Sequence, residues 1–150
     1  MSSLFGQLRA MRRLSQLSPE ARRFLARAWV TVPVIELSLA VAGVQGTLRW
    51  IETIPAAATS ARATSIEEGG WLVRAACRRH PLAGQCLSQA LLQYLLHRRD
   101  GVPARLVIGV KREASRLDAH AWVESPERTA ATSGSEFAPL LTRQAPEAHA

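Results

Sequence analysis

Two residues of this chain have side chains that could together perform nucleophilic chemistry. The run Gly84-Gln-Cys-Leu-Ser-Gln-Ala-Leu-Leu-Gln-Tyr-Leu-Leu-His97 has a strong apolar pattern and places Cys86 at the start of a helix. His120 lies in a strand-like run further along the chain. A thiol attacks well only when ionised, and the positive end of a helix favours the thiolate. A neighbouring histidine can take the thiol proton and later donate it to a leaving amine. The sequence therefore suggests thiol catalysis, provided that the fold brings Cys86 and His120 together.

Each of these residues also has a purely structural explanation. Free cysteine is among the most buried residue types, so Cys86 could simply fill a core. His120 could be an ordinary histidine on the surface of a sheet. The catalytic hypothesis gains weight from the face that His120 shares with Asp118, Trp122 and Glu124, because a carboxylate could orient the imidazole ring and an aromatic side chain could shield it.

The element that must position Cys86 is a helix. Leucines recur at helical spacing after the cysteine and give the run a wide apolar face, which is typical of a helix packed in the centre of a domain. The run ends in Arg98-Arg-Asp-Gly101, with cations in the last turn and a glycine to close it. In this setting we expect His97 to be a charge partner of the helix end.

The element that must position His120 is a strand. After Pro103 the apolar period changes to two, which predicts one strand over Ala104–Val110 and a second over Leu117–Glu124. Lys111–Arg116 is polar and is expected to be the turn of an antiparallel hairpin. Phe137–Leu141 could be a last short strand or a docking segment.

The first half of the chain predicts further helices. Ser18 followed by Pro19 is a helix start, with the serine as N-cap. The apolar run Ala28–Gly43 is shorter than the roughly twenty residues that span a bilayer, and Pro33 and Glu36 interrupt it. We expect a buried pair of helices bent near Pro33, with peripheral membrane contact as an open alternative.

A low-complexity connector, Pro55–Ser65, is the best internal boundary. It divides the chain into a helical N-terminal region, residues 1–64, and a core, residues 65–150, which together should form one compact unit. Ser65 can cap a new helix that ends near Cys77, with Trp71, Leu72 and Ala75 on one face. The expected fold class is α+β, with helices packed on a small antiparallel sheet.

Length, net charge and the placing of the arginines indicate which kinds of partner to expect. A chain of 150 residues suits a single domain, and its net charge of +7 comes almost wholly from arginine. The arginines occur in pairs on separate elements, and no nucleic-acid-binding motif accompanies them, so we expect no nucleic-acid partner. Solvated helix faces explain them best, with an acidic peptide partner as the alternative. No secretory signal opens the chain, so a cytoplasmic, reduced protein is expected.

No cofactor or metal is expected. Cys77, His80 and Cys86 lie close in sequence, but their spacing matches no zinc pattern and lacks a fourth ligand. Neither a phosphate loop nor a dinucleotide fingerprint is present. Cys77 is expected to be a packing residue, and His80 is expected to be exposed in a loop, although it could line the site.

Three segments together resemble the leader peptidases of bacterial lasso-peptide biosynthesis, which belong to the transglutaminase-like cysteine protease superfamily. They are Arg79-His-Pro-Leu-Ala-Gly-Gln-Cys-Leu-Ser-Gln-Ala-Leu, Gly101-Val-Pro-Ala-Arg-Leu-Val-Ile-Gly-Val and Asp118-Ala-His-Ala-Trp-Val-Glu. The resemblance implies a transglutaminase-like or papain-like core around the Cys86 helix. It also implies that Cys86 attacks the scissile carbonyl of a precursor peptide, with His120 as general base.

The resemblance further implies partners: the precursor peptide, a separate small protein that binds its leader, and an ATP-dependent macrocyclase that closes the ring. This chain departs from the family in one respect. The family's third catalytic residue is an aspartate on the strand after the histidine, whereas here that neighbourhood reads Ala130-Ala-Thr-Ser-Gly-Ser-Glu136. Glu136 could fill the role, as could Glu124 or Asp118 from the histidine's own strand. A non-catalytic scaffold that recruits precursor and cyclase is the alternative.

Overall fold

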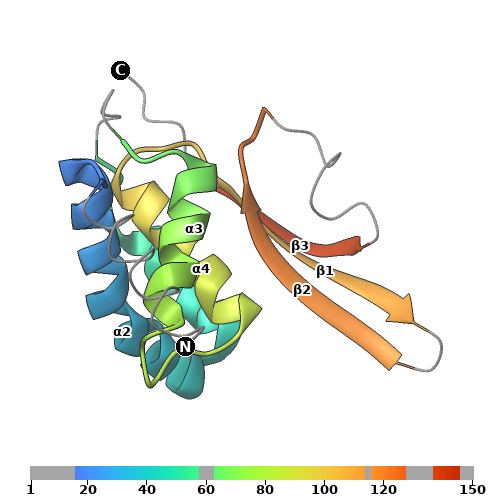
Figure 1. Cartoon of the computed structure of the whole chain (residues 1–150). Helices are drawn as coiled ribbons and strands as arrows, with labels where there is room; N and C mark the ends of the chain where they lie inside the picture. The colour runs from blue at the N-terminus through green and yellow to red at the C-terminus, as the bar shows by residue number, and fades with distance from the viewer. Residues whose placement is uncertain (1–15, 58–62, 114–115, 128–136, 146–150) are drawn as a thin grey trace, which may run out of the picture.

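Three helices and a three-stranded sheet make up the computed structural model, which describes residues 16–57, 63–113, 116–127 and 137–145. The elements are α2 (Pro19–Thr53), α3 (Ile66–Cys77), α4 (Cys86–Arg99), β1 (Arg105–Glu113), β2 (Arg116–Glu124) and β3 (Ala138–Gln144). Figure 1 shows the helices gathered on one side and the strands on the other, with the β1–β2 hairpin extending beyond the helices. The expected α+β class is confirmed.

Helix α2 starts where the sequence predicts and bends where it does not. The Ser18 hydroxyl accepts a hydrogen bond from the first turn, and Pro19 is the first helical residue. The helix continues through Pro33 and breaks at Gly43, whose backbone has φ 63° and ψ −173°. The expected bend near Pro33 is therefore wrong. Glycine adopts positive φ without steric cost, whereas the carbonyl freed by Pro33 is that of Trp29, on an exposed part of the helix where water can bind it.

Helix α3 begins at the predicted cap, because the Ser65 hydroxyl accepts the backbone N–H of Glu68 at 3.2 Å. It ends at Cys77, as expected. Of the three residues expected on one face, Leu72 is fully buried, whereas Trp71 and Ala75 are half-buried. The residues that pack inward are Gly69, Gly70, Leu72, Val73, Ala76 and Cys77. The two glycines let α4 approach closely, with His97 against Gly69 and Gln93 against Gly70.

Helix α4 is the centre of the fold. It contacts α2, α3, β1 and β2, and its residues from Ala90 to Arg98 are buried. Gly101 follows it with φ 67°, as the closing glycine predicts. His97 was expected to be a charge partner at this end, and that expectation is wrong. Its ring is fully buried, packs on Phe24 at a centroid distance of 5.2 Å, and has no hydrogen-bond partner among the described residues.

The sheet has the order β2-β1-β3, with both pairings antiparallel. The predicted hairpin and the predicted last strand are both confirmed. The expected turn over Lys111–Arg116 is too long, because Lys111 and Arg112 pair with Asp118 and Leu117 in the β1–β2 ladder. This part of the hairpin extends past the helical layer into solvent, so polar residues can continue the ladder there (Figure 1).

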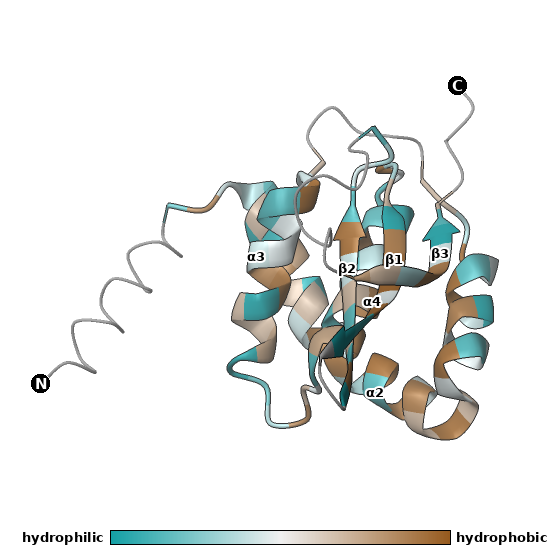
Figure 2. Ribbon diagram, turned by 90° about the vertical axis from the view of Figure 1, so that its right-hand side faces the viewer, coloured by the Kyte–Doolittle hydropathy of each residue, from teal (hydrophilic) through white to brown (hydrophobic). Residues whose placement is uncertain are grey.

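The N-terminal region and the core region share one hydrophobic cluster. Side chains of α2, α3, α4, β1 and β2 pack in it together. Arg27 of α2 also forms two hydrogen bonds of 2.6 Å with the carboxylate of Asp100, which caps α4. Figure 2 shows the sheet in front of α4, with α2 and α3 flanking that helix. Helix α2 is therefore part of the scaffold that holds the Cys86 helix in place.

Candidate active site

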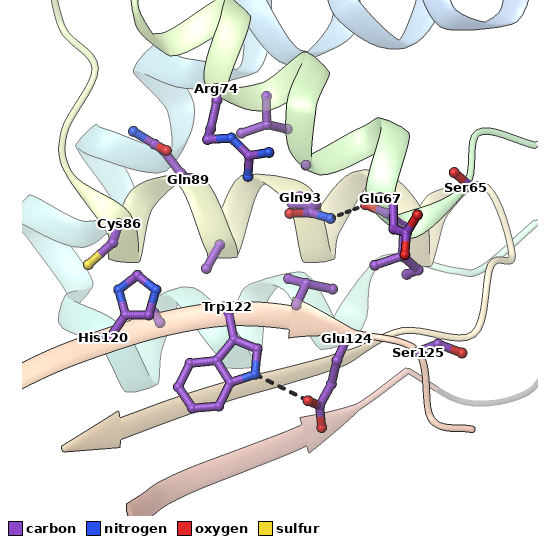
Figure 3. Close-up of a pocket in the computed structure, with 16 residues that line it drawn as sticks. Ser65, Glu67, Arg74, Cys86, Gln89, Gln93, His120, Trp122, Glu124 and Ser125 are labelled. Carbon is purple, nitrogen blue, oxygen red and sulfur yellow. Dashed lines mark hydrogen bonds between the residues drawn. The ribbon is translucent and has the colours of Figure 1, made fainter. Parts of the chain in front are cut away.

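A pocket of about 660 Å³ lies between α3, α4 and β2 (Figure 3). Helix α4 contributes Cys86 at one end of its lining, and β2 contributes the run from His120 to Glu124. Strand β2 is at the edge of the sheet, so the side chains of both its faces can border the pocket. The two residues that the sequence singled out for thiol chemistry thus line the same cavity.

Cys86 occupies the first position of α4, and no N-cap side chain binds the backbone N–H groups at the start of this helix. The N-cap residue, Gln85, makes no side-chain capping hydrogen bond, and the first turn contains no acidic residue. Cys86 is a partly exposed free thiol. The backbone N–H groups of a helix start carry partial positive charge, which stabilises an anion placed against them. Here no capping side chain or first-turn carboxylate competes for that charge.

The loop before Cys86 is fixed by a carboxylate from another helix. Glu36 of α2 accepts the backbone N–H of Gly84 at 2.5 Å. A Cβ at Gly84 would lie 2.5 Å from the Ser88 hydroxyl and 2.6 Å from the Glu36 carboxylate, so a larger residue would require these side chains to shift. In the sequence, Glu36 interrupts an apolar run. The structure gives it the role of tying the start of the Cys86 helix to α2.

His120 lies at the Cys86 end of the pocket, and Figure 3 shows its imidazole ring beside the cysteine side chain. Two aromatic rings flank the imidazole: Trp122 at a centroid distance of 5.9 Å and Phe137 at 5.5 Å. Gly109 pairs with His120 across the sheet. A Cβ there would be 2.9 Å from the Phe137 side chain and 3.0 Å from the Trp122 ring, so this glycine makes room for both aromatics.

The three candidates for a carboxylate that orients His120 differ in their surroundings. Glu124 accepts the indole N–H of Trp122 at 3.2 Å and pairs with Arg105 at 2.9 Å. Asp118 is exposed on the part of the hairpin that extends past the helices. Glu136 lies outside the described residues. Within the described part of the chain, no carboxylate is hydrogen-bonded to His120.

Cys77 and His80 are not among the residues that line the pocket. Cys77 is a free, buried thiol, as its expected packing role requires, and burial together with the nearby Glu36 carboxylate raises its pKa. His80 was expected to be exposed but is half-buried, because its ring packs against Trp29 at 4.8 Å and its Nδ1 accepts the Leu82 N–H. Among the described residues, no cluster of three or more His, Cys, Asp or Glu side chains could hold a metal ion.

Several polar residues of the pocket were missed by sequence reasoning. They are Arg74 and Glu67 of α3 and Gln89 and Gln93 of α4 (Figure 3). Gln93 is almost fully buried and donates a hydrogen bond of 2.8 Å to the carbonyl of Ile66. A usable signal existed, since two glutamines spaced four apart in a leucine-rich helix mark a polar stripe on one face.

A thiol at the start of a central helix, beside a histidine on an antiparallel sheet, is an arrangement that thiol-dependent acyl transfer can use. Comparison with known families agrees with this class. The model of the transglutaminase-like superfamily matches residues 28–142. The chain therefore belongs to this superfamily, which includes cysteine peptidases. Neither a curated protein nor a solved structure matches it.

Proposed function

We propose that this protein is a cysteine peptidase that removes the leader from a ribosomally made lasso-peptide precursor. The observation that carries the proposal is that Cys86 and His120 lie beside each other at one end of the same pocket. The superfamily match supports peptidase chemistry in general. The choice of a lasso-peptide precursor rests on the resemblance of the segments around Cys86, Arg105 and His120 to leader peptidases.

In the proposed mechanism, His120 accepts the proton of the Cys86 thiol, and the thiolate attacks the carbonyl carbon of the scissile amide. The backbone N–H at the start of α4 stabilises the oxyanion that develops. His120 then protonates the leaving amine, which departs as the new N-terminus of the core peptide. Water, deprotonated by His120, hydrolyses the thioester, releases the leader carboxylate and restores the thiol.

Three further features follow from the resemblance: the precursor is the substrate, a separate protein presents its leader, and an ATP-dependent macrocyclase consumes the freed amine. A cytoplasmic location is proposed as well, from the opening of the sequence, which does not resemble a secretory signal. A third catalytic group remains part of the proposal, with Glu136, Glu124 and Asp118 as its candidates. Glu124 would have to leave Trp122 and Arg105 to reach the imidazole.

The proposal is tested with the purified chain, a lasso-peptide precursor and a leader-binding protein, with the products followed by mass spectrometry. Cys86→Ala should abolish leader release, and His120→Ala should slow it by at least about a hundredfold. The matched control is Cys77→Ala, which removes the other thiol and should retain cleavage. Full cleavage by Cys86→Ala would refute the proposed nucleophile.

One observation favours the scaffold alternative, namely that no described carboxylate contacts His120. Alkylation by iodoacetamide near neutral pH separates the two functions. If the pocket activates Cys86, it should react much faster than Cys77, whose burial raises its pKa and shields it. Equal, slow labelling of the two thiols would favour the scaffold.

A further inference from the structure

The outward face of α2 carries an exposed apolar stripe. Its members are Val30, Val34, Leu37 and Val41, with exposed fractions of 67%, 45%, 65% and 79%. Their spacing of four, three and four residues places them on one side of the helix. The opposite side, which includes Phe24 and Ala28, packs in the core. A helix on the surface of a soluble domain normally presents polar residues outward, so this stripe indicates an interaction surface.

The exposed charged residues of α2 beside this stripe are arginines, and the acidic Glu20 and Glu52 lie just outside the span that they occupy. Between Arg22 and Arg49, the exposed positions of α2 include three arginines (Arg22, Arg23 and Arg49) and no acidic residue. Glu36, the one acid inside this span, is half-buried and engaged with Gly84. The surface is therefore apolar along the stripe, with the exposed Arg22 and Arg23 toward the start of α2.

A neighbouring loop widens the surface. Trp29, 48% exposed, packs against His80 and so holds the loop Arg78–Leu82 beside α2. Leu82 is 60% exposed, and Arg78 and Arg79 are exposed as well. The loop thus adds one aliphatic side chain and two cations next to an indole ring. Trp is a residue that prefers the boundary between lipid headgroups and acyl chains.

By length and composition alone, helix α2 is apolar enough to cross a bilayer. Spanning would strip its inner face from the core, and the break at Gly43 interrupts a straight path. A contact parallel to the membrane keeps the core intact and buries only the exposed face. In Figure 2 the lowest part of α2, where the helix turns, is mostly brown, the colour of apolar residues.

We propose that the α2 stripe and the Arg78–Leu82 loop form a docking surface for an anionic lipid membrane. The aliphatic side chains would enter the acyl boundary, and the flanking arginines would pair with anionic headgroups. This surface is separate from the pocket, because the pocket is lined by α3, α4 and β2. The docking proposal therefore stands or falls independently of peptidase activity.

The test is co-sedimentation of the full chain with vesicles of phosphatidylcholine alone or of an equal mixture of phosphatidylcholine and phosphatidylglycerol. We expect the chain to bind the anionic vesicles more strongly, and added salt to weaken the binding. Leu37→Glu should lower the partition coefficient at least about tenfold, and Arg22→Gln with Arg23→Gln should lower it about fivefold per arginine. Leu117→Glu is the matched control: Leu117 is 76% exposed on β2, away from the stripe, and its variant should bind like wild type.

Because Leu37 and Val41 are exposed, their glutamate variants should fold, which circular dichroism would verify, and Val41→Glu provides a second measurement. Absence of binding to anionic vesicles at low salt overturns the proposal. The proposal is also overturned if the arginine variant loses binding while Leu37→Glu keeps it, because charge alone would then explain the binding. A dimer of the lipid-free chain that Leu37→Glu dissociates would assign the stripe to self-association instead.

Discussion

The buried His97 makes the stability of this protein depend on pH. Its side chain is fully buried in the last turn of α4, against Phe24. Burial, with a smaller opposing effect from Asp100, lowers the pKa of His97 from 6.5 to about 4. The imidazole is therefore neutral in the folded protein at neutral pH, whereas in the unfolded chain it titrates at its ordinary value.

The sign and size of the effect follow from linkage. Between pH 6.5 and about 4 the unfolded chain binds a proton that the folded protein does not, so the free energy of unfolding falls as the pH falls. A pKa difference of about 2.5 units corresponds to about 3 kcal/mol, at 1.36 kcal/mol per unit. This stability is fully present above pH 6.5 and is lost as the pH approaches 4.

The assay is urea denaturation of wild type and His97→Leu at a series of pH values from above 6.5 down toward 4. Wild type should lose about 3 kcal/mol more than the variant across this range, because leucine cannot take up the proton. Comparing the two proteins cancels the contributions of all other titrating groups that they share. Parallel pH profiles, or a His97 ring that titrates at its ordinary value by NMR, would refute the assigned burial.

Two further predictions concern the contacts that hold α4, both measured by urea denaturation at neutral pH. Arg98→Met should lower the free energy of unfolding by about 2 kcal/mol, because the buried guanidinium donates hydrogen bonds to the carbonyls of Glu52 and Ile54 at the end of α2; an unchanged midpoint would contradict this role. Glu36→Gln keeps the shape of the side chain but replaces a charged acceptor of the Gly84 N–H by a neutral one, at a cost of about 1 kcal/mol. A Glu36→Gln variant more stable than wild type would show that this contact is not favourable.

The boundaries of the elements could be predicted where the signal is local. Ser18 and Ser65 accept first-turn N–H groups, and Gly101 has the positive φ of a helix-closing glycine. These residues act within a few positions of themselves, so the sequence alone contains the information. The strands were predictable for a similar reason. The period of two in the sequences of β1 and β2 arises because successive side chains of a strand point to opposite faces of the sheet.

Features that depend on distant residues were not predictable. His97 lies among arginines in sequence, which favoured an exposed position, yet the absence of a side chain at Gly69 of α3 opens the space that its ring fills. Helix α2 continues through Pro33 and breaks at Gly43, although a proline is the stronger local signal for a bend. In the pocket, Cys86 and His120 were predictable from their residue types, whereas the place of Arg74 in the lining depends on how α3 packs against α4.

Helix α2 explains why a pocket on α3, α4 and β2 depends on residues far from it. At the end of α4 remote from Cys86, Arg27 binds the capping Asp100, and Arg98 binds the last carbonyls of α2. At the Cys86 end, Glu36 holds the preceding loop through Gly84. Helix α4 is thus fixed to α2 at both ends, and the position of the thiol is set by that attachment. The superfamily match begins inside α2, at residue 28, as expected if most of this helix belongs to the catalytic scaffold.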